Sequence, residues 1–251
     1  MPGQTRTKLG ELDSLVVETA VAPKSGGSLI VVLHGWGGSA SDLASLVRPL
    51  ARRGARVILP DGHQPHPAAG RAWWALDLEK RRLVAASGRE LDLSGEVPDG
   101  LAEARGKVLA LVAEACRRYQ PKTLALVGFS QGAMLALDVA LFAEPPVDAV
   151  VVLAGTLLAE RVWRERMLLA QTNRPRVFIA HGREDPILPI TMSLRLRDLL
   201  TDHGFLVRWK SFEGGHLVPQ AVLDELGMFL RDAERAAEPR ARCPASAPGI
   251  Q

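Results

Sequence analysis

The sequence predicts an α/β fold with a mostly parallel central sheet and helices on both faces of that sheet. Two observations lead to this prediction. Short apolar runs rich in β-branched residues alternate along the chain with longer segments whose apolar residues recur about every 3.6 positions. The short runs are apolar almost throughout, as expected of strands that are buried on both faces. Regular alternation of strand and helix indicates βαβ units, whose strands lie parallel.

The predicted strands differ in their apolar patterns. The run at 13–20 is expected to form a first, antiparallel strand, and the alternating run at 205–212 is expected to lie toward an edge of the sheet. The strands expected between them are more uniformly apolar and occupy residues 28–35, 55–60, 123–128, 148–155 and 175–182.

The predicted helices follow from apolar spacing and from residues that start or stop helices. Ser41 or Asp42 is a candidate N-cap, and Gly54 and Gly204 are typical of helix ends. The segment at 78–100 is polar and interrupted by glycine, so no regular element is assigned to it. The helices are expected at residues 41–54, 98–119, 131–143, 189–204 and 218–236.

Composition indicates a globular protein with one substantial core. The chain has 251 residues, of which 47% are hydrophobic and 24% charged, which is ordinary for a globular domain. We expect a single domain over 1–236 and a disordered, Pro- and Ala-rich tail over 237–251. No apolar run reaches the ~18 residues of a membrane span, and the N-terminus lacks the features of a secretory signal. A cytoplasmic location without integral membrane association is therefore expected.

Charge and cysteine content argue against two further classes of protein. The net charge is +3 and the pI is near 9.1, but the basic residues are interleaved with acids and form no long block. Nucleic acid is therefore not expected as a partner. The two cysteines, Cys116 and Cys243, form neither a CxxC motif nor a disulfide framework.

Polar and glycine residues directly follow several of the predicted strands. In a parallel sheet, loops at the carboxyl ends of the strands meet at one edge, where functional groups gather. The sequence therefore predicts a site at this edge, built from residues 34–38, Ser130, residues 181–186 and residues 213–216.

Ser130 lies in the motif GFSQG, between a predicted strand and a predicted helix. Glycines at 128 and 132 allow the sharp strand-to-helix turn that exposes a nucleophilic serine in G-x-S-x-G motifs. The positive end of the following helix would also face the hydroxyl. The alternative interpretation is an ordinary turn in which Ser130 caps the helix.

The partners that such a serine needs appear later in the chain, in the order acid and then histidine. Asp185 follows one predicted strand and His216 follows the next. His216 would accept the serine proton, and Asp185 would hold the imidazole in the required tautomer. Taken separately, Asp185 could be a turn residue before Pro186 and His216 a loop residue beside glycines. His181 is expected to serve the turn rather than catalysis.

The glycine-rich stretch HGWGG at 34–38 is expected to turn backbone N–H groups into the site. The expected pair of oxyanion donors is the N–H of Gln131 and the N–H of Trp36 or Gly37. His34 is expected to brace this loop through hydrogen bonds.

These motifs resemble those of the phospholipase/carboxylesterase family of α/β-hydrolases, which includes acyl-protein thioesterases. Gln131 directly after Ser130, and the tryptophan-containing segment upstream, make the resemblance more specific than a general hydrolase pattern. It covers roughly residues 28 to 232 and rests on LHGWGG, RAWWALD, LVGFSQGAMLAL, HGREDPILP and EGGH.

The resemblance implies an α/β-hydrolase fold and a cofactor-free serine esterase acting on small-molecule or acyl esters or thioesters. It implies a catalytic triad of Ser130, Asp185 and His216, with oxyanion donors at Trp36 and Gln131. It also implies that a tryptophan pair, Trp73 and Trp74, lines the acyl side of the cleft. A related hydrolase of aryl or sugar esters is the enzymatic alternative, and a non-catalytic ligand-binding protein on the same fold is the alternative from another class.

Other polar and aromatic residues are expected to have structural roles. Asp138 is expected to face solvent or to cap its helix. His63 and His66 lack the rigid spacing of metal ligands, so no metal site is expected and the pair is placed in a wall of the cleft. Trp163 and Met167 lie four apart on one apolar helix face, which favours core packing over a small lid.

Overall fold

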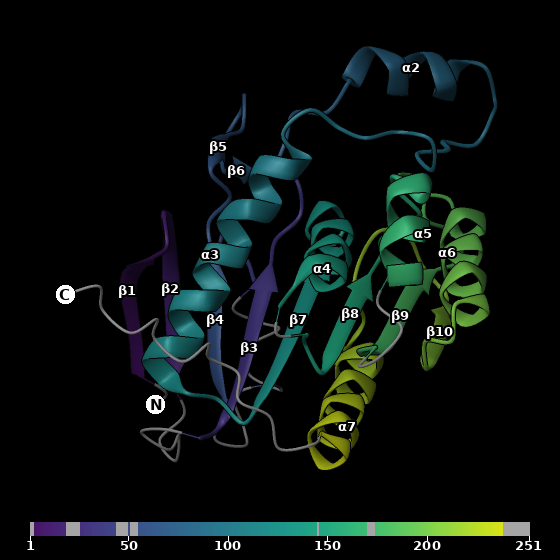
Figure 1. The fold of residues 1–251 in the computed structure, drawn as a ribbon. Coiled ribbons are helices and arrows are strands. Elements are labelled where there is room, and N and C mark those ends of the chain that lie inside the picture. The colour runs from purple at the N-terminus through teal and green to yellow at the C-terminus, as the bar shows by residue number, and fades with distance from the viewer. Residues whose placement is uncertain are drawn as a thin grey trace.

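An eight-stranded sheet forms the centre of the protein in a computed structural model that describes residues 3–18, 26–43, 50, 55–144, 146–169 and 174–237. The strand order is β1-β2-β4-β3-β7-β8-β9-β10 (Figure 1). The strands are β1 (Gly3–Leu9), β2 (Leu12–Glu18), β3 (Ser28–Leu33), β4 (Arg56–Pro60), β7 (Thr123–Phe129), β8 (Ala149–Leu153), β9 (Arg176–Gly182) and β10 (Val207–Phe212).

Strand directions agree with the prediction of a mostly parallel sheet. Strand β2 pairs antiparallel with β1 and β4, whereas β4, β3, β7, β8, β9 and β10 run parallel to one another. The antiparallel first strand predicted at 13–20 is confirmed as β2, and the run predicted near an edge is confirmed as the edge strand β10. A separate small ribbon pairs β5 (Gln64–Pro65) with β6 (Arg71–Ala72).

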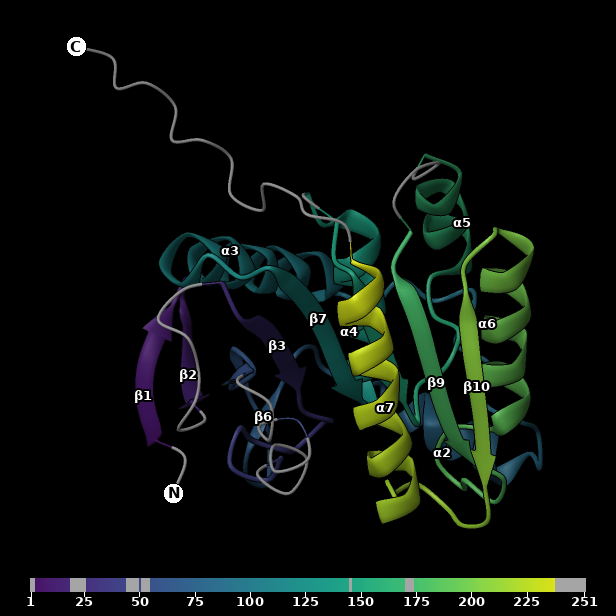
Figure 2. The same cartoon turned by 90° about the horizontal axis from the view of Figure 1, so that it is seen from below.

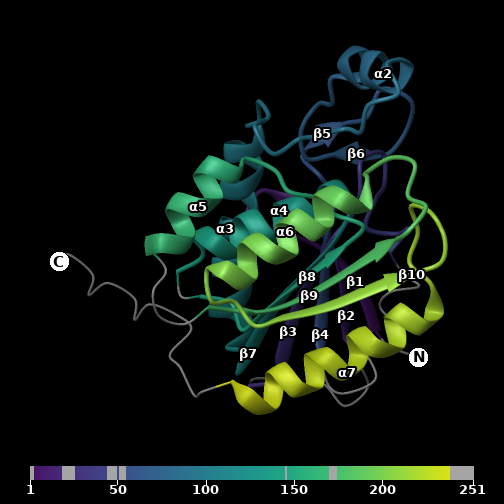
Figure 3. The same cartoon turned by 90° about the vertical axis from the view of Figure 1, so that its right-hand side faces the viewer.

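Helices cover both faces of the sheet (Figures 2 and 3). Helices α3, α4 and α6 pack on one face of the sheet, where α6 contacts β9 and β10. Helix α7 packs against β8 and β9 on the opposite face. Helix α5 packs on α4, and α2 stands away from the sheet above its carboxyl edge. Their bounds are α2 (Leu78–Ala86), α3 (Leu101–Tyr119), α4 (Gln131–Phe142), α5 (Glu160–Leu169), α6 (Ile190–Asp202) and α7 (Gln220–Ala236).

The core consists of two clusters, one on each face of the sheet. Along β3, Leu29, Val31 and Leu33 pack into the cluster under α3 and α4, whereas Ile30 and Val32 pack into the cluster under α7. Successive side chains of a strand point to opposite faces, and here both faces are covered. This explains why the central strands are apolar at nearly every position.

The packing of α4 corrects one expectation from the sequence. Asp138 neither faces solvent nor caps the helix, because it is fully buried and accepts hydrogen bonds from Arg105 Nε at 2.5 Å and from Trp163 Nε1 at 2.8 Å. Burial raises the pKa of Asp138, and the bonds from Arg105 and Trp163 oppose that rise. Trp163 and Met167 are also fully buried, which confirms their predicted place in the core.

Some predicted elements fall on residues that are not described. The helix expected at 41–54 lies outside the described residues except at 41–43 and 50, and the tail expected from 237 lies outside them except at Ala237. Within the described part of the chain, no helix has the length and hydropathy needed to cross a bilayer.

Candidate active site

Ser130 lies where β7 ends and α4 begins, at the carboxyl edge of the sheet. Its backbone has φ 55°, in the left-handed region that costs a non-glycine residue free energy. The N–H of Ser130 donates to Leu153 O at 2.9 Å, so β8 holds the turn in place. The Ser130 side chain makes no capping bond to α4, which argues against the alternative interpretation of this residue as a helix cap.

The two glycines around Ser130 are required because backbone segments approach closely. A Cβ at Gly132 would lie 2.6 Å from the carbonyl carbon of Leu33, and a Cβ at Gly128 would overlap the carbonyl of Gly132. Helix α4 can therefore start against β3 only if both positions lack a side chain.

Replacing Gly132 with alanine is expected to lower the free energy of unfolding by about 3 kcal/mol, the upper end of the usual cost of overpacking. Chemical denaturation checks this value. The matched control is Gly106→Ala in α3, where a Cβ meets nothing within 4 Å. That change should stabilise the helix by about 0.5–1 kcal/mol. Equal stability of the two variants would contradict the proposed close approach at Gly132.

His216 joins Ser130 to Asp185 by a continuous chain of hydrogen bonds. His216 Nδ1 lies 2.7 Å from Asp185 Oδ2, and His216 Nε2 lies 2.8 Å from Ser130 Oγ. A carboxylate only accepts hydrogen bonds, so Nδ1 carries a proton, and in the neutral form of the imidazole Nε2 accepts from the serine hydroxyl. In this arrangement the serine proton can pass to the imidazole.

Asp185 both stabilises the turn that follows it and forms a hydrogen bond with His216, the two functions considered for it from the sequence. Its Oδ1 accepts from the N–H groups of Ile187 and Leu188, both at 2.9 Å, while its Oδ2 faces His216. Burial by itself would raise the pKa of Asp185. Hydrogen bonds from His181, from His216 and from the two N–H groups outweigh burial and hold the pKa of Asp185 well below its usual range. The carboxylate therefore stays ionised beside His216.

His181 contacts two residues of the turn that contains Asp185. Its Nε2 lies 2.8 Å from Leu188 O and 3.4 Å from Asp185 Oδ2, and the side chain is fully buried. These contacts confirm the structural role expected from the sequence.

The glycine-rich loop after β3 places backbone donors near Ser130. Gly37 N–H donates to Arg71 O at 2.9 Å, so of the two candidates Trp36 and Gly37 only Trp36 keeps its N–H available. Among the described residues, no acceptor lies within hydrogen-bond distance of the N–H of Trp36 or of Gln131. These are the two N–H groups expected to act as oxyanion donors.

His34 braces the same loop, as expected. Its Nδ1 donates to Gly35 O at 2.7 Å, and its Nε2 accepts from Gly62 N–H at 2.8 Å. Burial lowers the pKa of His34, although the bond to Gly35 opposes that effect, which suits a neutral structural imidazole.

The tryptophan pair occupies two different environments. Trp74 borders a cavity, but Trp73 is fully buried and its indole donates to His34 O at 2.9 Å. The structure thus places Trp73 in the support of the loop rather than on a cavity wall, which differs from the expected lining role. The Gln131 side chain, whose role was not predicted, accepts from Trp73 N–H at 3.0 Å and donates to Trp74 O at 2.8 Å.

The histidine pair at 63 and 66 packs beside this region. His66 packs edge-on against Trp36, with ring centroids 4.1 Å apart, and His63 Nε2 lies 3.6 Å from Glu103 Oε2. Within the described ranges, no group of three or more potential metal ligands is found.

Two cavities adjoin different parts of the candidate site, one at Asp185 and the other at Trp74. The first has a volume of about 610 Å³ and is bounded by Asp185 and its loop, and the second, of about 340 Å³, is bounded by Trp74 and by Met134 of α4. Arg81 of α2 and Leu91 line both cavities. Arg81 was not identified from the sequence, because the polar segment that forms α2 was not predicted to be a helix.

The architecture and the site together define an α/β-hydrolase fold. The family model described as Phospholipase/Carboxylesterase matches residues 15–233, and the chain belongs to that family. This confirms the resemblance inferred from the sequence motifs.

Individual relatives agree with the family. Over 113 residues, the chain is 33% identical to acyl-protein thioesterase 1 of Gibberella zeae, covering 44% of this chain and 48% of that protein. The chain thus spans about half the length of the curated relatives it matches. The crystal structure of esterase PE8 is 27% identical with a TM-score of 0.73, covering 88% of this chain and 99% of that one. Zea mays acyl-protein thioesterase 2 shares the fold at 23% identity, with a TM-score of 0.68 and coverage of 88% and 98%.

Proposed function

We propose that this protein is a serine hydrolase of carboxylic esters and thioesters that works through an acyl-enzyme intermediate. The observation that carries the proposal is the hydrogen-bonded chain from Asp185 through His216 to Ser130. Membership of the phospholipase/carboxylesterase family supports it, and the names of two relatives, esterase and acyl-protein thioesterase, suggest the substrate class.

The proposed reaction has two halves. Ser130 Oγ attacks the substrate carbonyl carbon while His216 Nε2 takes the hydroxyl proton, and the oxyanion accepts hydrogen bonds from the N–H groups of Trp36 and Gln131. His216 then gives its proton to the leaving alcohol or thiol. A water molecule attacks the acyl-enzyme with His216 as base, and Ser130 recovers its proton as the acid product leaves.

Asp185 contributes in both halves by holding the His216 tautomer and stabilising the imidazolium. We assign the acyl chain and the leaving group to the two cavities, of which the larger is bordered by Asp185 and the smaller by Trp74. No cofactor enters any of these steps.

Hydrolysis of p-nitrophenyl esters of increasing acyl length, before and after treatment with a fluorophosphonate, tests the proposal. We expect turnover that is lost once one equivalent of the probe has bound, because the probe reacts with an activated serine. Absence of turnover together with absence of labelling would favour the non-catalytic binding protein. Turnover that survives complete labelling would contradict the serine mechanism.

A further inference from the structure

A helix and loop above the carboxyl edge of the sheet contain an arginine whose guanidinium makes no hydrogen bond or ion pair with any residue the structure describes. We call residues 77–96, which comprise α2 and the loop after it, the cap segment. It lies above the carboxyl edge of the sheet (Figure 1) and contributes Arg81 and Leu91 to the walls of both cavities.

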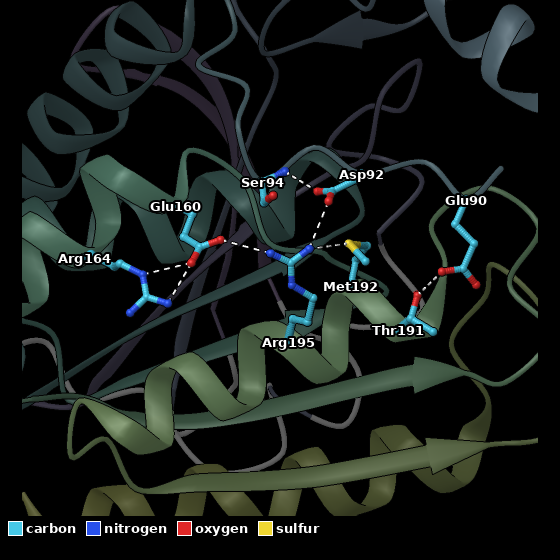
Figure 4. Close-up of polar contacts among 8 residues, drawn as sticks. All are labelled: Glu90, Asp92, Ser94, Glu160, Arg164, Thr191, Met192 and Arg195. Carbon is cyan, nitrogen blue, oxygen red and sulfur yellow. Dashed lines mark hydrogen bonds and ion pairs between the residues drawn. The ribbon is translucent and has the colours of Figure 1, made fainter.

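Polar contacts fix the loop part of the cap segment to two helices of the body (Figure 4). Arg195 of α6 donates to Asp92 at 2.9 Å and to Glu160 of α5 at 3.2 Å, and Thr191 donates to Glu90 at 2.6 Å. Two backbone bonds join the same loop to the start of α5. The loop therefore provides a fixed support for the cavity walls.

Helix α2 has no buried residue, yet one side of it is turned toward the cavities. Only Arg81 and Val84, three positions apart, are partly buried, whereas the other residues of the helix are exposed. Residues three or four apart share one helix face. A face turned toward the protein is normally apolar, so a guanidinium at this position calls for an explanation.

Among the described residues, no acceptor lies within hydrogen-bond or ion-pair distance of the Arg81 guanidinium. Burial lowers the pKa of Arg81, and the charge of Glu96 opposes this shift. Glu96 itself already binds Lys80 at 2.6 Å. Arginine stays protonated under these conditions, so the cavity wall presents a fixed positive charge.

The other carboxylates that line the cavities do not neutralise this charge. Three of them have partners already, since Glu90 binds Thr191, Asp77 caps α2 and Asp185 binds His216. The remaining two are exposed and make no hydrogen bond or ion pair with Arg81; they are Glu184 and Asp99.

A partly buried cation without a partner is costly unless a ligand supplies the counter-charge. The planar guanidinium matches a carboxylate in shape and can donate two parallel hydrogen bonds to it. We propose that Arg81 binds a carboxylate of the substrate, so that the enzyme prefers esters that carry a negative charge. This inference rests on the proposed esterase function and specifies its substrate class.

The test compares charged and neutral esters of equal length in wild type, Arg81→Gln and Arg82→Gln. One pair places the carboxylate on the acyl side, namely mono-p-nitrophenyl glutarate against p-nitrophenyl pentanoate. The other pair places it on the leaving group, namely 4-carboxyphenyl butyrate against phenyl butyrate. Arg82 is the matched control because it is adjacent to Arg81 and exposed.

In at least one pair, Arg81→Gln should lower the ratio of kcat/KM for charged over neutral ester by about 10- to 100-fold, the usual effect of losing a charged hydrogen bond. Arg82→Gln should leave both ratios as in wild type. An unchanged ratio in both pairs, or an equal change in the two variants, would overturn the inference.

A binding measurement separates this inference from the proposed function. Glutarate is titrated into wild type and Arg81→Gln by calorimetry, a readout that needs no turnover. If wild type hydrolyses none of the esters, the proposed function fails, and the Arg81 inference stands only if glutarate binding weakens at least tenfold in the variant. Equal binding by the two proteins would overturn it.

Discussion

Replacing Ser130 with alanine is expected to lower kcat by about 10⁶-fold, as measured when the nucleophile of a comparable triad is removed. Without Oγ no acyl-enzyme can form, and His216 loses the hydroxyl that lies 2.8 Å from its Nε2. Residual turnover would come from the oxyanion donors and from substrate binding. Steady-state hydrolysis of p-nitrophenyl butyrate measures the effect.

Ser28→Ala is the matched control for this variant. Ser28 lies at the opposite end of β3 and bonds to Thr123 at 2.9 Å, far along the strand from the carboxyl edge. The Ser28→Ala variant should retain the wild-type kcat. Ser28→Ala and Ser130→Ala should both keep the circular dichroism spectrum of wild type. A Ser130→Ala protein with kcat within tenfold of wild type would show that another group performs the attack.

Asp185→Asn is expected to lower kcat by about 10⁴-fold at neutral pH, the cost of an imidazole held in the wrong tautomer. The amide can still accept the two turn bonds from Ile187 and Leu188 through its oxygen. Its NH₂ group would then face His216 Nδ1 and donate to it. The His216 proton would move to Nε2, where it points at Ser130 and prevents proton transfer.

Measuring Tm alongside kcat distinguishes loss of the correct His216 tautomer from loss of the folded structure. Asp232→Asn is the control, because Asp232 lies on α7 and pairs with Arg208 at 3.1 Å, away from the site. The control should keep wild-type kcat, and Asp185→Asn should keep a wild-type Tm within a few degrees. A large loss of Tm in Asp185→Asn would assign the activity loss to the turn instead.

The sheet and the candidate triad could be predicted because local signals and chain order agree. The central strands are buried on both faces, so their apolar runs are visible without knowing the fold. Ser130, Asp185 and His216 each follow such a strand, and parallel strands end at one edge. The order serine, acid, histidine then indicated which polar residues would meet there.

Elements without a buried face could not be predicted in this way. Strand β1 is almost entirely exposed and α2 has no buried residue, so neither shows an apolar period. Strand β1 is held by backbone pairing with its neighbour β2, and α2 by the ion pair of Lys80 with Glu96, and neither kind of contact produces an apolar pattern in the sequence. Arg81 went unnoticed for the same reason.

Buried polar residues were the other source of error. Asp138 looked like a surface residue because an acid in a helix usually faces water. Its partners Arg105 and Trp163 come from α3 and α5. Trp73 was expected on a cavity wall, but it is buried in the core, where its indole N–H donates a hydrogen bond to the backbone oxygen of His34. Such pairings depend on how distant helices and loops pack together.

Locating the acyl group during turnover tests the serine mechanism. The enzyme is mixed with a p-nitrophenyl ester, quenched in acid within the first turnovers and digested for mass spectrometry. We expect the acyl mass on the peptide containing Ser130, in an amount that matches the initial burst of p-nitrophenol. Acylation of a different residue, or turnover without a covalent adduct at any quench time, would rule out Ser130 as the nucleophile.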